Sequence, residues 1–211
     1  DTLIGGGTGT AGASEYDYLD GGDGIDFVSY SSITDSLQSV TINLGLSYDG
    51  SFGDHDFNDT NSDGKVGNYQ DGGAAGRIQI VNVENLEGGS GNDTIQGNEE
   101  NNTLDGSNGN NTISYSGALG SVTVDLGLQG QSQNTIADGV DYLLNFQNLI
   151  GSSYSDTLKG DANTNIINGG AGDDLLFSEA GNDTIDGGDD NDTIDYSAIV
   201  DSKYSGSYPF I

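Results

Sequence analysis

The sequence predicts an all-β protein, a flattened parallel β-solenoid of nine-residue units, and three observations predict it. First, five units of nine residues follow one another without a gap from Gly151 to Asp195. Second, each unit opens with a segment rich in Gly, Asn and Asp, which tolerate the positive φ angles of tight turns. Third, the eighth position of each unit is apolar and lies in a segment long enough for a short strand. One unit therefore makes a turn and a strand, and two units make one coil.

The same unit recurs earlier in the chain. Three units fill residues 88–114, and a single unit fills residues 21–29. Residues 6–20 are interpreted as a unit with a small insertion and residues 1–4 as the tail of another, so we expect the repeat to continue before them. The eighth positions are expected to face the interior, and they are Leu19, Val28, Ile95, Leu104, Ile113, Leu158, Ile167, Leu176, Ile185 and Ile194.

Two inserts separate these arrays and resemble each other. SVTINLGL begins at Ser39 and SVTVDLGL begins at Ser121, and both alternate apolar and polar residues with period two, which predicts half-buried strands. The inserts close with the similar segments NVENLEGG and NFQNLIGS. Plain spacers are the alternative, but the similarity of the two copies favours structured inserts. Tyr30, Tyr115 and Tyr196 recur at matching insert positions, which favours a structural role for them.

These patterns divide the chain into six expected segments. Residues 204–211 fit no repeat and remain unassigned. The division is repeats at 1–29, a β insert at 30–87, an array at 88–114, a second β insert at 115–150, an array at 151–195, and the start of a third insert with the tail at 196–211.

The composition requires a counterion if the chain is to fold. The 211 residues carry 34 acidic side chains against four basic ones, a net charge of −30, and only 32% are hydrophobic. Such a chain is disordered by default, because it repels itself and buries little apolar surface. The acidic residues recur beside glycines at fixed offsets, where hard cations bind. The negative charge also argues against nucleic acid as a partner.

Several classes of protein find no support in the sequence. Cysteine is absent, so neither disulfides nor thiolate metal sites contribute. No apolar run is long enough for a transmembrane helix, so membrane insertion is not expected, and the start of the chain lacks the pattern of a signal peptide. The single histidine, His55, is interpreted as a solvated loop residue. A G-x-S-x-G nucleophile motif is also missing, and we expect no catalytic site.

The nine-residue units resemble a known repeat. GGDGIDFVS, from Gly21, and GGSGNDTIQ, from Gly88, match the pattern G-G-x-G-x-D-x-(apolar)-x of the RTX, or haemolysin-type calcium-binding, repeat family. The inserts are similar to the extender segments of long RTX adhesins and surface proteins. The resemblance implies a parallel β-roll with calcium ions in its turns, type I secretion, and folding outside the cell, at the cell surface.

The resemblance also implies which residues bind calcium, namely positions two, four and six of each turn, the first two through backbone carbonyls. Residues eighteen apart should stack, so that two turns share an ion, with Asp156, Asp174 and Asp192 in one row and Asp183 above Asn165. The expected ligands are Gly22, Gly24, Asp26, Gly89, Gly91, Asp93, Asn111, Asp156, Asn165, Gly170, Gly172, Asp174, Glu179, Gly181, Asp183, Gly188, Asp190 and Asp192.

Two features of these turns modify the expectation. Position six is Asn in three units, which keeps an oxygen but removes a charge, so we expect the array 88–114 to hold fewer or weaker ions than the array 151–195. The alternative for each Gly/Asx turn is an Asx-turn that binds nothing. Five units in register favour calcium.

A second kind of calcium loop is predicted in the first insert. Asp59, Asn61, Asp63 and Lys65 occupy positions one, three, five and seven of an EF-hand-like loop, with glycine at position six. Position twelve is Gln70 instead of the usual Glu, so a plain loop is the alternative.

Calcium is therefore the expected cofactor and main partner, with several ions acting as a folding switch. The leading hypothesis is a structural module of a secreted adhesin, S-layer or other surface protein, with a surface glycan or self-association in a layer as further partners. A carrier domain of a secreted enzyme or toxin and a carbohydrate- or peptide-binding module are the alternatives.

Overall fold

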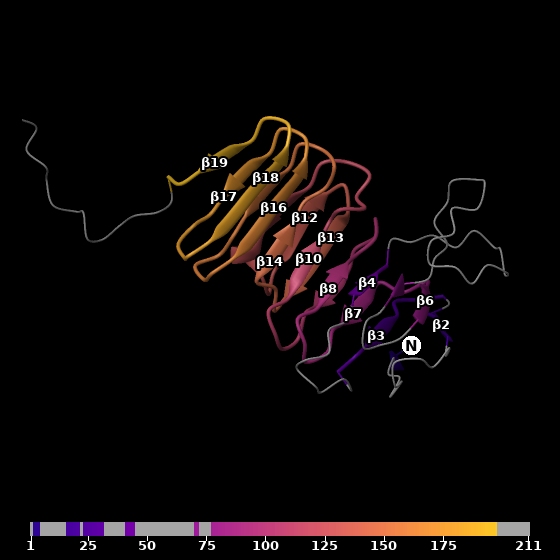
Figure 1. Cartoon of the computed structure of the whole chain (residues 1–211). Coiled ribbons are helices and arrows are strands. Elements are labelled where there is room, and N and C mark those ends of the chain that lie inside the picture. Colours follow the sequence, from indigo (N-terminus) through magenta and orange to yellow (C-terminus); the bar gives the residue numbers. More distant parts are fainter. Residues whose placement is uncertain are drawn as a thin grey trace, which may run out of the picture.

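The computed structural model of the chain describes residues 2–4, 16–21, 23–31, 41–44, 70–71 and 77–197. The described residues form a stack of short strands that cross the long axis of the molecule (Figure 1). No helix in these residues is long and apolar enough to cross a membrane. The predicted all-β, parallel solenoid is confirmed.

Four sheets make up the stack. One face consists of the sheet β18 (Thr184–Asp189), β16 (Ile166–Ala171), β14 (Asn148–Ile150), β10 (Thr112–Ser114), β8 (Thr94–Gln96) and β4 (Thr41–Asn43). The other face begins with β1 (Thr2–Ile4), β3 (Phe27–Ser29), β7 (Asn85–Glu87), β9 (Thr103–Asp105), β13 (Gly139–Leu144) and β12 (Ser132–Ile136). It continues with β11 (Thr123–Asp125), β15 (Thr157–Lys159), β17 (Leu175–Phe177) and β19 (Thr193–Asp195). A smaller sheet has the order β2 (Tyr16–Asp20), β6 (Arg77–Val81) and β5 (Gln70–Asp71).

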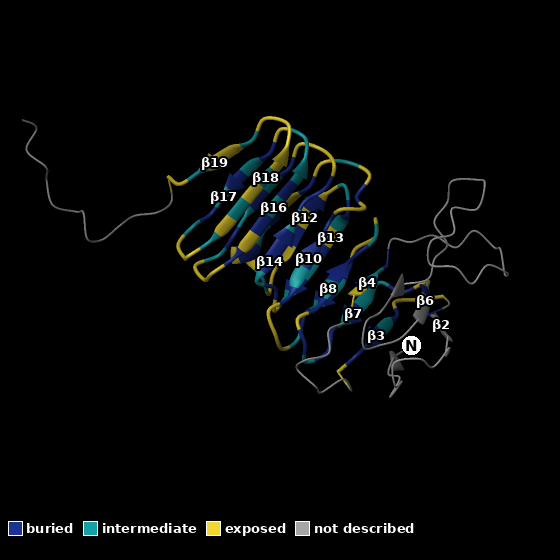
Figure 2. Ribbon diagram, viewed as in Figure 1, coloured by how far each residue is buried: buried dark blue, intermediate teal, exposed yellow. Residues whose placement is uncertain are grey.

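The register of the parallel strands places the eighth positions on top of one another. Leu158 pairs with Leu176 and Leu176 with Ile194, so the step between coils is eighteen residues. The eighth-position residues from Val28 to Leu176 that the structure describes are fully buried and form the core. Ile194 is 39% exposed, because β19 is the last strand of its sheet. Figure 2 shows the same change from buried to exposed toward β18 and β19.

Each insert forms a three-stranded meander where a regular coil has one strand. In the second insert, β11 pairs with the later strand β15, β12 runs antiparallel to β13, and β13 pairs with the earlier strand β9. In the first insert, β4 pairs with the later strand β8, β5 runs antiparallel to β6, and β6 pairs with the earlier strand β2. The two inserts therefore share one topology, as their sequence similarity indicated.

The strands of the inserts are shorter than the sequence alternation predicted. In SVTVDLGL, β11 ends at Asp125, and residues Leu126–Leu128 form a 3-10 turn. The Asp125 carboxylate accepts a hydrogen bond from the Gly127 N–H at 2.7 Å and so caps this turn. The predicted half-buried strand is present, but it covers only Thr123–Asp125 because this cap ends it.

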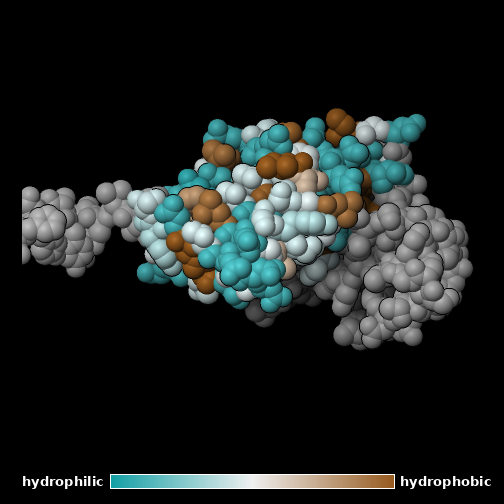
Figure 3. All heavy atoms as spheres, turned by 90° about the horizontal axis from the view of Figure 1, so that it is seen from above, coloured by the Kyte–Doolittle hydropathy of each residue, from teal (hydrophilic) through white to brown (hydrophobic). Residues whose placement is uncertain are grey.

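The closing segments of both inserts belong to the regular stack. β7 lies between β3 and β9, and β14 lies between β10 and β16. The unassigned residues 204–211, and residues 6–15 of the unit interpreted at 6–20, lie outside the described residues. On the described surface, hydrophobic side chains form only small separate groups in the view of Figure 3.

Candidate calcium-binding turns

A ladder of hydrogen bonds links the position-six residues of successive coils. The Asp156 N–H donates to Asp174 Oδ1 at 2.7 Å, and the Asp174 N–H donates to Asp192 Oδ1 at 3.0 Å. On the opposite edge, the Asn165 N–H donates to Asp183 Oδ1 at 2.9 Å. The predicted stacking at eighteen residues is confirmed, and it brings acidic side chains of neighbouring turns close together.

The ladder continues through the inserts on residues that sequence reasoning missed. The Asp26 N–H donates to Glu84 Oε2 at 2.8 Å, and the Asn111 N–H donates to Gln147 Oε1 at 2.7 Å. Glu84 and Gln147 lie two residues before a buried leucine, which is the offset between positions six and eight. That offset was the available signal, but the Gly-rich half of the unit is missing before them.

Glycine at positions two and four lets carbonyl oxygens of stacked turns approach the chain. Gly170 has a φ of +108°, and a Cβ there would lie 2.1 Å from the Ser152 carbonyl oxygen. Gly188, one coil later, has a φ of +98°, and its Cβ would lie 2.0 Å from the Gly170 carbonyl oxygen. A side chain would therefore be strained and would also fill the space between the turns. Carbonyl oxygens that line such a space are ligands that calcium prefers.

Asp156 is satisfied by the protein itself. Its carboxylate accepts hydrogen bonds from the Ser152 N–H at 2.5 Å, the Ser152 hydroxyl at 2.8 Å and the Val122 N–H at 2.8 Å. Asp93 is also held within its own turn, because it accepts from the Gly89 N–H at 2.8 Å. Three donors compensate much of the cost of burying a carboxylate, so Asp156 does not need a cation for its charge to be tolerated.

Asp174 occupies the same position one coil later, but one of its oxygens is unpaired. Its side chain is 2% exposed, and its Oδ2 has no hydrogen-bond partner among the described residues. The reason lies in Gly170, whose backbone pairs with Gly188 in the next strand instead of turning toward Asp174. A buried carboxylate oxygen without a donor is costly unless a proton or a cation binds it.

The electrostatics of Asp174 agree with this interpretation. Burial raises the pKa of Asp174 to about 6, although the hydrogen bond from the Asp156 N–H lowers it. The nearby carboxylates of Asp156 and Asp192 raise it further. A divalent cation would reverse this effect, since it favours the charged carboxylate. The donor set at Asp174 therefore fits calcium.

Asparagine at position six replaces part of what an ion would do. The Asn111 side-chain amide donates to the carbonyl oxygens of Asn145 at 3.0 Å and Asn108 at 3.3 Å. The Asn165 amide donates to the Gln147 carbonyl oxygen at 2.8 Å. Asparagine amides thus satisfy carbonyl groups of their own and of neighbouring turns. Two of the three asparagines, Asn102 and Asn111, belong to the array 88–114, which supports the expectation of fewer ions there.

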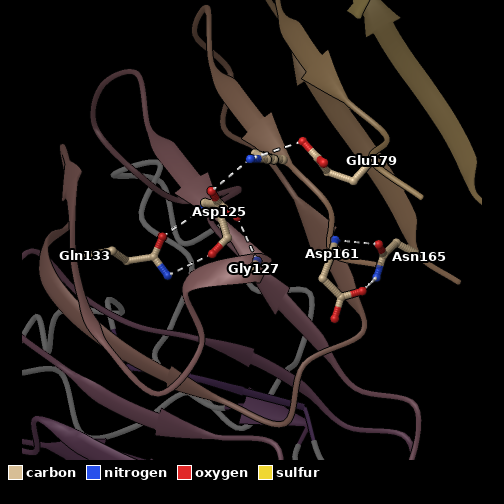
Figure 4. A network of polar contacts seen from close by, with 7 residues as sticks. Asp125, Gly127, Gln133, Asp161, Asn165 and Glu179 are labelled. Atoms are coloured by element: carbon tan, nitrogen blue, oxygen red, sulfur yellow. Dashed lines mark hydrogen bonds and ion pairs between the residues drawn. The ribbon is translucent and has the colours of Figure 1, made fainter. Parts of the chain in front are cut away.

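The remaining predicted ligands are placed as follows. Asp26 and Asp93 are buried, whereas Asp190 is exposed and has a φ of +81° at position four. The Glu179 carboxylate forms an ion pair with Lys159 at 3.1 Å, and Lys159 also pairs with Asp125 at 3.5 Å (Figure 4). Gly24 and Gly181 have positive φ angles, as their turn positions require, whereas Gly91 is not among the residues with positive φ. Gly22 and the EF-hand-like residues Asp59, Asn61, Asp63 and Lys65 lie outside the described residues.

No group of three or more His, Cys, Asp or Glu side chains suited to a metal ion occurs among the described residues. The expected ligand set is of another kind, with one carboxylate and several backbone carbonyls from each turn. Such a site depends on the stacking of turns rather than on a cluster of acidic side chains.

Parallel strands in register at a step of eighteen residues, joined by stacked Gly/Asp turns, define the chain as a parallel β-solenoid of nonapeptide repeats. The model of the RTX calcium-binding nonapeptide repeat, in 4 copies, matches residues 83–117, 147–176 and 168–198. Residues 83–117 and 147–198 are therefore similar to the RTX calcium-binding nonapeptide repeat. The matches include the segments of β7 and β14, which close the two inserts. No curated protein matches the chain.

Proposed function

We propose that the chain is a calcium-dependent structural module of a type I-secreted adhesin, S-layer or other surface protein, and that it folds outside the cell. RTX repeats are calcium-binding structural modules of secreted proteins, which supports the calcium and the export. The resemblance of the inserts to adhesin extenders supports the surface role. The observation that carries the calcium dependence is the buried, unpaired Oδ2 of Asp174 between stacked glycine turns.

The residues of two stacked turns would hold each ion together. Asp174 would supply a charged oxygen, and the carbonyl oxygens beside Gly170 and Gly188 would complete the shell. Because the ligands come from different coils, the site forms only when the coils stack. Calcium binding then stabilises the folded state by mass action and also reduces the repulsion of a chain with a net charge of −30.

Circular dichroism during a calcium titration tests the proposal. The chain is expected to be largely unfolded in a chelator and to gain β-structure cooperatively as calcium rises toward millimolar concentrations. Magnesium should substitute poorly, because its smaller shell demands stricter octahedral geometry. A β-sheet signal that survives complete chelation would contradict the proposed folding switch.

A further inference from the structure

The second insert contains a carboxylate that, like Asp174, is buried and has one oxygen without a hydrogen-bond partner. Asp138 lies between β12 and β13, its side chain is 3% exposed, and its Oδ2 has no hydrogen-bond partner among the described residues. Asp138 belongs to none of the turns whose positions two, four and six were predicted to bind calcium. Its burial therefore needs a separate explanation.

Asp141, three residues away, is a buried carboxylate that does have hydrogen-bond donors. It is fully buried, and it accepts hydrogen bonds from the Asn102 N–H at 3.1 Å, the Tyr115 hydroxyl at 3.2 Å and the Thr135 hydroxyl at 3.4 Å. The Thr135 hydroxyl also donates to the Gly139 carbonyl oxygen at 3.0 Å, so the Asn102 N–H and the Tyr115 hydroxyl are the main donors to Asp141. Asp138 Oδ2 has no donor among the described residues. Leaving a second carboxylate unpaired beside the first is unfavourable unless something else binds it.

The turn of the β12–β13 hairpin, residues 137–138, packs against the turn that precedes β9. This contact brings backbone carbonyl oxygens close to the hairpin turn. Gly139 has a φ of +87°, and a Cβ there would lie 2.4 Å from the Glu100 carbonyl oxygen and 3.1 Å from that of Glu99. The Val140 N–H donates to Asn101 Oδ1 at 2.9 Å and holds the two turns together. The Glu99 side chain is exposed and lies near enough for its negative charge to raise the pKa of Asp138.

We propose that the hairpin turn and the turn before β9 hold a divalent cation between them, with the Asp138 carboxylate as its buried ligand. The carbonyl oxygens of Glu99 and Glu100 lie against Gly139, the residue after Asp138, and the Glu99 carboxylate is near enough to act on Asp138 electrostatically, so these are the other oxygens that could reach the ion. Carboxylate and carbonyl oxygens with no nitrogen or sulfur favour calcium over transition metals. The ion would fix the insert to the repeat array, where hydrogen bonds alone leave Asp138 Oδ2 without a partner.

Counting bound ions on the intact chain by native mass spectrometry tests this site. Asp138→Asn preserves the shape of the side chain but removes the charge, and it should reduce the number of tightly bound calcium ions by one. Asp186→Asn is the matched control, because Asp186 is exposed on β18 and belongs to no proposed site, so the count should not change. An unchanged count in Asp138→Asn would overturn the proposal.

A second measurement keeps the test decisive if Asp138→Asn does not fold. In the wild-type chain, NMR amide signals of Gly139 and Glu100 should change with calcium, and the exposed substitution Glu99→Gln should weaken that response. The site would be contradicted if the Gly139 and Glu100 signals changed only with folding and showed no further change with calcium, and if Glu99→Gln gave the same response as the wild type. The same measurements distinguish this site from the proposed function. A wild-type chain that binds no calcium ion at all would contradict the proposed function itself, whereas a chain that binds calcium only in its Gly/Asp turns would contradict the Asp138 site alone.

Discussion

Asp156 and Asp174 show how residues at one position of a repeat can acquire different chemistry. Both stand at position six of stacked units, and both are buried. The difference comes from position two, where the N–H and hydroxyl of Ser152 donate to Asp156. Gly170 has no hydroxyl, and its N–H does not donate to Asp174 Oδ2. The first aspartate is held by protein donors, whereas one oxygen of the second has no donor, which is consistent with the proposed calcium ion.

This difference predicts opposite calcium responses for two conservative substitutions. Asp174→Asn should remove a calcium ligand, so the melting temperature Tm should rise less steeply with calcium concentration than in the wild type. Asp156→Asn should lower Tm by a similar amount at every calcium concentration, because it removes acceptors worth about 1–3 kcal/mol but no ion. Tm measured across a calcium series checks both slopes. Equal slopes for the two variants would contradict the distinction between the turns.

At the scale of elements, one side chain connects two strands of the second insert, β11 and β12. Gln133 on β12 accepts from the Asp125 N–H at 2.9 Å, and its amide donates to the Asp125 carbonyl oxygen at 3.4 Å (Figure 4). The Gln133 side-chain amide thus bonds to the backbone of β11 as a residue of a neighbouring strand would. The backbones of β11 and β12 themselves are joined by an isolated bridge between Val122 and Ile136. The two sheets of this face meet at this point.

Gln133→Ala should therefore loosen the junction between the sheets. The Asp125 N–H loses its acceptor, so its hydrogen exchange should become faster and the chain should lose about 1 kcal/mol of stability. Hydrogen-exchange NMR or mass spectrometry in calcium measures both effects. Gln131→Ala, an exposed neighbour, is the control and should leave the exchange of Asp125 unchanged.

The sequence predicted the elements well but not all of their partners. The nine-residue period is local, so the strands, their register and the buried eighth positions could be derived from the residues of each unit. The partners of the inserts are not local, since β11 pairs with a strand 34 residues later and β13 with one 39 residues earlier. Asp138 was missed for the same reason, because its environment includes Glu99 and Glu100 from another unit.

At the scale of the whole molecule, acidic groups dominate and cations are scarce. In the described part of the chain, the Lys159 ammonium group forms ion pairs with Asp125 and Glu179, which belong to neighbouring coils. The hydrogen bond to Glu179 raises the pKa of Lys159, so this cation stays charged in the folded chain. Because the lysine is 38% exposed, water screens these ion pairs and their contribution is small. Calcium or protons must provide most of the compensation.

The calcium-free chain should accordingly become more stable as the pH falls. Burial raises the pKa of Asp141 to about 7 and those of Asp138 and Asp174 to about 6, above the ordinary value of 3.8. The folded chain therefore binds these protons more tightly than the unfolded chain, and the resulting stability is lost as the pH rises through 6 to 7.

Circular dichroism in chelator should show more β-structure at about pH 5 than at about pH 7.5. With calcium present, acid should instead raise the calcium concentration needed for folding, because protons compete for the same carboxylates. A chelated chain that loses structure between these two pH values would contradict the prediction.

The placement of the two meanders also has a consequence for the direction of the solenoid. The first insert adds its extra strands on the side of β2 and β8, and the second adds its own on the side of β9 and β15. Each addition widens one side by two strand spacings, about 10 Å, while the opposite side advances by a single strand. Extra strands on one side of the solenoid should tilt its long axis, and extra strands on the opposite side should then tilt the axis back. Paired inserts of this kind lengthen a rod and shift it sideways without curling it into a ring.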